Sequence, residues 1–171
     1  MTQIVLTDLE KARQLAGTAQ LCAVAALVVI AVSIAHTLGA PLWELFVKGE
    51  SSRREQLLAL SHLVLSALPA ILLFEAVQQL SRALKHYENG EFFGREAPQR
   101  VARAGDLAMQ AMLAAMVVVP TLTRWLDSRG GFDLRLEPEF IGMLAFALFI
   151  SLAGRILQAA AGLKDENDAF I

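Results

Sequence analysis

Residues 15–38 read LAGTAQLCAVAALVVIAVSIAHTL and contain no Asp, Glu, Lys or Arg. A helix needs about 20 consecutive apolar residues to cross the hydrocarbon core of a membrane. The stretch is also too long for the apolar region of a cleaved signal peptide, which has about 7 to 15 residues. Residues 23–32 are apolar on every side of a helix, which leaves no face for water. The stretch therefore predicts a retained membrane-spanning helix.

Three further stretches have the same apolar character, at residues 56–80, 107–126 and 140–163. The charged residues inside them are Glu75, Arg124 and Arg155. A water-soluble bundle would need polar faces at the helical period, and these stretches lack them. We therefore predict an all-α integral membrane bundle of four transmembrane helices, a single domain over residues 1–171. A short cytoplasmic helical hairpin is expected between the second and third helices.

The composition of the chain excludes several classes of protein. Of its 171 residues 56% are hydrophobic and 19% are charged, which excludes a disordered chain. A net charge of −2 is unsuited to a DNA-binding domain. The single cysteine, Cys22, excludes an intrachain disulfide and a cysteine-based zinc site.

The distribution of Lys and Arg predicts the orientation, because cytoplasmic segments carry an excess of both. Nine of them flank the side on which both termini lie, and six flank the other side. Both termini and the segment between the second and third helices are therefore expected in the cytoplasm. The nine residues are Lys11, Arg13, Arg82, Lys85, Arg95, Arg100, Arg103, Arg155 and Lys164.

The middle segment, residues 81–105, is the most informative part of the chain outside the apolar stretches. Residues 81–88 can continue the second helix. Asn89 and Gly90 then favour the end of that helix, because both tolerate a left-handed backbone. Pro98 suits the first turn of the next helix.

Two interpretations of this segment stay open. It is either a positively charged loop, with Phe92 and Phe93 at the membrane interface and arginines near anionic headgroups, or a docking surface for a cytoplasmic protein. The residues of such a surface would be Gly90, Glu91, Phe92, Phe93, Arg95, Arg100 and Arg103.

Residues 84–105, LKHYENGEFFGREAPQRVARAG, resemble the signature of a bacterial membrane protein family, the domain of unknown function 2975. The residues that carry the resemblance are Gly90, Glu91, Phe93, Arg100 and Arg103, and residues 163–168 resemble the acidic tail of that family. The resemblance implies four helices in a bacterial membrane, which we expect to be the inner membrane. It implies no activity, since the family has none assigned. Its members are often encoded beside a small helix-turn-helix regulator, which implies a sensing or signalling role.

Glu75 and Arg155 are the charged residues expected inside the membrane, where such side chains are costly. Counted along their helices, the two differ in depth by about 6 Å, within reach of an arginine side chain. One interpretation is an intramembrane ion pair that holds the second helix against the fourth. The other is that each side chain extends separately to the interface. A proton or ion relay would need further ionisable residues nearby, and none is evident.

His36 and His62 are expected at similar depths on the first two helices, as two axial haem ligands would be. No third ligand or supporting acid accompanies them, and interface histidines bonded to water or backbone explain them better. We therefore predict neither a metal nor a cofactor.

The apolar stretches contain small residues that can pack closely and prolines that interrupt helix hydrogen bonding. Ala108, Ala111 and Ala115 give the third a face that favours close helix packing, either within one chain or between two. Pro69 and Pro120 each remove a helix hydrogen bond. The freed carbonyl groups are expected to bond the nearby hydroxyl groups of Ser66 and Thr121.

No enzyme signature is present: residues 90–94 are not a phosphate-binding loop, and the chain has no Gly-x-Ser-x-Gly or His-Glu-x-x-His. We therefore expect a non-enzymatic sensor or interaction partner that signals through the middle segment to a cytoplasmic regulatory protein. The alternative is a subunit of an oligomeric small transporter or channel, which Glu75 and Arg155 would serve. The expected partners are the lipid bilayer, a cytoplasmic protein and further copies of the chain, with no direct contact to nucleic acid.

Overall fold

The computed structural model describes residues 2–47, 52–91 and 94–168. Its elements are α1 (Thr2–Val47), α2 (Arg53–Glu88), α3 (Glu96–Leu113), the π-helical segment η1 (Ala114–Val118), α4 (Val119–Leu126) and α5 (Pro138–Asp168). Because α3, η1 and α4 follow one another without a break, they form one long helix. The predicted all-α architecture of four long helices is confirmed.

All four long helices are long and apolar enough to cross a membrane. These candidate spans are Glu10–Trp43, Arg53–Glu88, Glu96–Leu126 and Pro138–Leu163, and each contains one predicted apolar stretch apart from small differences at its ends. The helices extend beyond the predicted stretches because polar sequence continues them. At 1.5 Å per residue, the 36 residues of α2 extend over about 54 Å, well beyond the roughly 30 Å of a hydrocarbon core.

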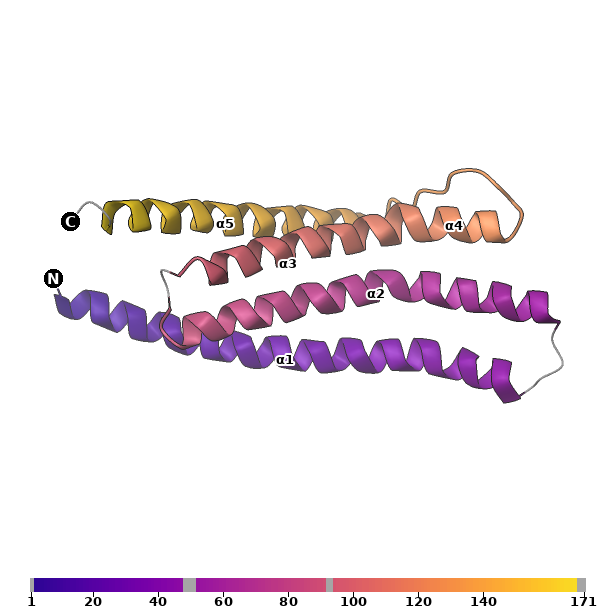
Figure 1. Ribbon diagram of the computed structural model, residues 1–171, viewed down its shortest axis with the longest axis horizontal. Helices are drawn as coiled ribbons and strands as arrows, with labels where there is room; N and C mark the ends of the chain where they lie inside the picture. Colours follow the sequence, from indigo (N-terminus) through magenta and orange to yellow (C-terminus); the bar gives the residue numbers. More distant parts are fainter. Residues whose placement is uncertain (1, 48–51, 92–93, 169–171) are drawn as a thin grey trace.

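The helices lie side by side in the order α1, α2, α3, α5 (Figure 1). The start of α1, the end of α5 and the connection between α2 and α3 lie at one end, which we call the termini end. The opposite end is called the far end. Since α3 packs against both α2 and α5, it stands between them.

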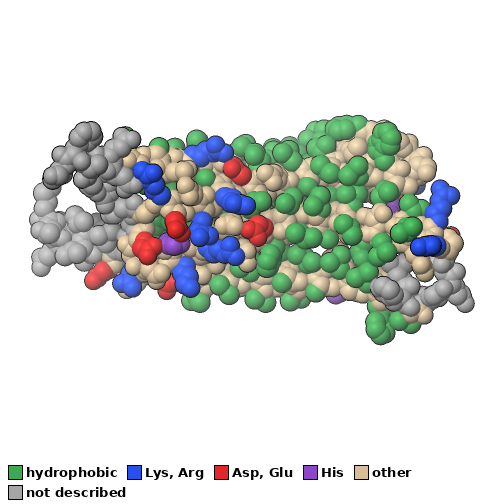
Figure 2. Space-filling view, viewed as in Figure 1, with side chains coloured by type: hydrophobic (Ala, Val, Ile, Leu, Met, Phe, Trp, Pro, Cys, Tyr) green, Lys and Arg blue, Asp and Glu red, His purple; other side chains and the backbone are tan. Residues whose placement is uncertain are grey.

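The described part of the chain has small side chains inside and large apolar side chains outside. Its buried hydrophobic residues are mostly alanines, whereas Leu21, Val29 and Phe149 are more than 65% exposed. Figure 2 shows hydrophobic side chains across the middle of one face and charged side chains gathered toward its ends. Small residues at helix contacts and large apolar residues facing outward are typical of helices packed in lipid.

Two glycines allow a close helix contact between α3 and α5. A Cβ atom added to Gly105 would overlap the backbone of Ser151, and one added to Gly154 would overlap the backbone of Ala102. Of the small residues predicted to pack, Ala111 is fully buried, but this close contact uses Gly105 and Gly154 instead. Each helix thus supplies one glycine to the contact.

The expected role of the hydroxyl groups beside the prolines is wrong. Pro120 leaves the carbonyl oxygen of Met116 without its helical donor, and the backbone N–H of Arg135 donates to that oxygen at 3.0 Å. The Thr121 hydroxyl instead donates to the carbonyl of Asp133 at 2.9 Å. The chain between α4 and α5 therefore folds back along α4. Likewise, the Ser66 hydroxyl donates to the carbonyl of Leu63, not to the carbonyl freed by Pro69.

Candidate functional site at the termini end

The first residues after α2 are held by backbone hydrogen bonds. The helix α2 ends at Glu88, and Gly90 takes a left-handed backbone with φ of +85°. The backbone N–H of Glu91 donates to the carbonyl of His86 at 3.0 Å. These features confirm the predicted continuation of the second helix and its end at Asn89 and Gly90. The expected hairpin is therefore formed by the ends of α2 and α3 themselves.

Side-chain contacts centred on His86 join α2 to Glu91 and to the start of α3. Its Nδ1 lies 2.6 Å from Oε2 of Glu91, and its Nε2 lies 3.5 Å from Oε2 of Glu96. The same oxygen of Glu96 lies 3.5 Å from Nη2 of Arg100. At the last residue of α2, the carbonyl of Glu88 accepts a hydrogen bond from Nε of Arg13 on α1, at 2.6 Å. Three helices are thus tied together at this end.

Several cations at this end have no acidic partner. Among the side chains that the structure describes, Arg82, Lys85 and Arg103 form no ion pair. Arg100 reaches only Glu96, and its Nε atom is buried without a hydrogen-bond partner. A buried N–H without a partner costs about 1 to 3 kcal/mol. Positive charge is therefore left uncompensated between α2 and α3.

Two pockets lie among these cations, and Arg100 lines both. One has a volume of about 310 Å³ and includes Gln79, Gln99 and Arg103 in its lining. The other has a volume of about 200 Å³ and includes Arg82 and Lys85. We call this region the basic cleft, lined by Gln79, Arg82, Lys85, His86, Asn89, Glu96, Gln99, Arg100 and Arg103. Figure 2 shows blue, red and purple side chains gathered over this end of α2 and α3.

The structure divides the residues predicted for a docking surface into two groups. Gly90, Glu91 and Arg95 lie in the connection, where all three are exposed. Arg100 and Arg103 lie on α3 and line the basic cleft. Phe92 and Phe93 lie outside the described residues.

The predicted ion pair between Glu75 and Arg155 is wrong. Nη2 of Arg155 lies 3.1 Å from Oδ2 of Asp106 on α3, and the Ser151 hydroxyl donates to Oδ1 of the same aspartate at 2.6 Å. Glu75 accepts a hydrogen bond from Nε2 of Gln79, one turn along α2, at 2.6 Å. The physical reason is the order of the helices, because α3 stands between α2 and α5.

Asp106 is the residue that sequence reasoning missed. It lies between the middle segment, residues 81–105, and the predicted third stretch, residues 107–126, and belongs to neither. A signal was present in the sequence: Ser151 and Arg155 are four residues apart and share a helix face, so a single carboxylate can bond both. Asp106 also follows Gly105, where α3 and α5 come close together.

The two histidines of the apolar stretches do not share a site. His62 on α2 pairs with Asp127 at the far end, with 3.1 Å between Nε2 and Oδ1. His36 is exposed on α1. In the described ranges, no group of three or more His, Cys, Asp or Glu side chains could hold a metal ion.

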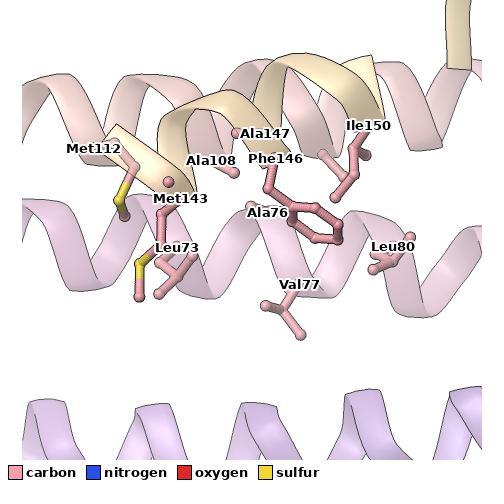
Figure 3. Close-up of a pocket in the computed structure, with 12 residues that line it drawn as sticks. Leu73, Ala76, Val77, Leu80, Ala108, Met112, Met143, Phe146, Ala147 and Ile150 are labelled. Carbon is pink, nitrogen blue, oxygen red and sulfur yellow. The ribbon is translucent and has the colours of Figure 1, made fainter. Parts of the chain in front are cut away.

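An apolar cavity of about 390 Å³ lies between α2, α3 and α5 (Figure 3). Figure 3 shows Phe146 of α5 on one side and Val77 and Leu80 of α2 on the other. Ala104 and Ala108 of α3 also line it. Because every lining residue is apolar or glycine, the cavity can hold only an apolar group.

Comparison with known proteins gives no match: no family model, no curated protein and no solved structure is similar to this chain. The resemblance to the domain of unknown function 2975 therefore stays a prediction.

Proposed function

We propose that this chain is a multi-pass protein of a bacterial inner membrane and a non-enzymatic interaction or sensing partner. A cytoplasmic protein docks on the connection between α2 and α3. The excess of Lys and Arg at the termini end supports a cytoplasmic location for this connection. The four apolar helices support insertion in a membrane.

The observation that carries the proposal is the fixed geometry of an exposed charged tip. His86 binds both Glu91 in the connection and Glu96 at the start of α3. These contacts hold Glu91 and the start of α3 in place before any partner arrives, so little ordering free energy is lost at these residues on binding. Gly94 and Arg95 stand exposed beside them, and we call residues 90, 91, 94 and 95 the tip.

The test is the double substitution Gly94→Glu with Arg95→Glu, which lowers the charge of the tip by three units. Tagged protein is extracted from its native membrane in mild detergent, and the co-purifying proteins are quantified. We expect one cytoplasmic protein in stoichiometric amount with the wild type. The variant should recover at least about tenfold less of it, since the change removes the cation of Arg95 and adds negative charge, which destroys the match to a partner selected for the native tip. A photo-crosslinking residue at position 94 should capture the same protein.

The matched control is Arg53→Gln with Arg54→Glu, which makes the same charge change on exposed residues at the far end. This variant should retain the partner. Equal recovery of the partner with the tip variant would contradict the docking surface. A homo-oligomer that carries no other protein would contradict the proposal itself and favour the transporter or channel subunit.

A further inference from the structure

We propose that the basic cleft binds the phosphate headgroup of one anionic phospholipid. The inference rests on insertion of the four helices in a membrane, which is part of the proposed function, and does not require the docking partner. The cleft adjoins the tip, since Glu96 and His86 line its two pockets. Its cations, however, are not tip residues: they are Arg82, Lys85, Arg100 and Arg103.

Charge is the first argument. Arg82, Lys85 and Arg103 have no acidic partner among the described side chains, and Nε of Arg100 is buried without an acceptor. The one carboxylate in the lining, Glu96, is already bonded to His86 and Arg100. A phosphate offers several strong acceptor oxygens, and arginine binds such a group with two parallel hydrogen bonds. An anion in the cleft therefore supplies acceptors to the accessible N–H groups of these cations, although not to Nε of Arg100, which is buried.

Depth is the second argument. The apolar part of the third span begins at Leu107, and Arg103 and Arg100 precede it by four and seven residues. At 1.5 Å per residue they lie about 6 and 10 Å beyond it along the helix. The headgroup layer on each side of the hydrocarbon core is about 5 to 8 Å thick. Arg103 therefore lies within the headgroup layer, and Arg100 lies just outside it, where its long side chain can reach back to the lipid phosphates.

The surface beyond the cleft is the third argument. Leu72 and Leu68 lie two and three turns from Gln79 on the same face of α2, toward the middle of the membrane. Glu75 lies on the same face, one turn from Gln79, and is bonded to it. Acyl chains attached to a headgroup in the cleft would run along the apolar part of the face beyond Glu75. Basic pockets between membrane helices on the cytoplasmic side are suited to anionic lipid headgroups for these reasons. A soluble acidic peptide would gain nothing from that face.

The test compares two double variants. The cleft variant carries Arg100→Gln and Arg103→Gln together, and the matched control carries Arg53→Gln and Arg54→Gln together. Purified, delipidated protein is titrated with phosphatidylglycerol or with phosphatidylcholine in mixed micelles, and bound lipid is counted by native mass spectrometry. We expect one tightly held phosphatidylglycerol on the wild type and on the control. The cleft variant should bind it about thirtyfold more weakly, because each lost arginine contributes about a factor of five.

Several outcomes would overturn the inference. Equal binding of phosphatidylglycerol by the cleft variant would show that the arginines do not hold the lipid. Equal binding of phosphatidylcholine would show that negative charge is not recognised. Displacement of the lipid by inorganic phosphate at the same concentration would assign the cleft to free phosphate.

A single variant keeps the test decisive if the double variant fails to fold. Arg103 is exposed and forms no ion pair among the described residues, so Arg103→Gln alone should leave the fold unchanged. It should still weaken phosphatidylglycerol binding about fivefold. The tip variant Gly94→Glu with Arg95→Glu should bind the lipid with a stoichiometry of one, which separates a failure of this inference from a failure of the docking proposal.

Discussion

Replacing Gly154 by leucine is expected to separate α5 from α3 and to prevent recovery of folded protein. Even a single Cβ atom at this position would overlap the backbone of Ala102. A backbone segment inside a helix cannot move aside as the end of a flexible side chain can. Overpacking commonly costs about 1 to 3 kcal/mol, and a leucine at a backbone contact should exceed that range. The total stability of a domain is only about 5 to 15 kcal/mol.

The measurement is thermal unfolding in detergent, together with size-exclusion chromatography of the purified variant. Gly162→Leu is the matched control, because Gly162 lies on the same helix with nothing within 4 Å of an added Cβ. This control should melt at or above the temperature of the wild type, since glycine is a poor helix former. If Gly154→Leu melted with the wild type, the close contact between α3 and α5 would be disproved.

The elements that could be predicted from the sequence are those whose signals are local. The absence of charge in residues 15–38 is sufficient to predict a spanning helix, and the same reasoning found the other three. The end of α2 at Asn89 and Gly90 also depends on neighbouring residues alone. The start of α2 had a local signal that was not used, the capping box in which Ser52 and Glu55 bond each other's backbone N–H.

The partner of Arg155 could not be predicted in the same way, because it depends on which helices are neighbours. Apolar length sets the depth of a residue and does not say which way its side chain faces. Depth alone makes Glu75 a reasonable partner for Arg155. The two residues lie on α2 and α5, however, and α3 stands between these helices. The close contact between α3 and α5 had a usable signal, since Gly105 follows Ala102 by three positions and Gly154 follows Ser151 by three. Small residues at such spacing allow two helices to approach.

The basic cleft also depends on tertiary structure. Arg82 and Arg103 are far apart in the sequence, and each alone is an ordinary positive-inside residue. Only the packing of α2 on α3 places them around shared pockets. That packing also leaves Arg100 with a buried N–H and no acceptor. This combination distinguishes a candidate binding site from a loop that is merely positive.

Removing the carboxylate of Asp106 is expected to destabilise the protein through Arg155. In water an exposed ion pair contributes at most about 1 kcal/mol. The side chain of Arg155 is 64% exposed, but what it faces in a membrane is lipid. An unpaired arginine near the hydrocarbon is more costly than one in water. Asp106→Asn should therefore lower the free energy of unfolding clearly, and it also weakens the bond from Ser151.

A double-mutant cycle separates the pair itself from these other losses. The variants are Asp106→Asn, Arg155→Gln and their combination, with unfolding followed in mixed micelles of increasing denaturing detergent. The combination should cost less than the sum of the single changes, with a coupling of about 1 to 2 kcal/mol. The parallel cycle with Glu75→Gln and Arg155→Gln should be additive, because Glu75 bonds Gln79 on its own helix. Coupling in the Glu75 cycle, together with additivity in the Asp106 cycle, would restore the ion pair predicted from sequence and reject the one between α3 and α5.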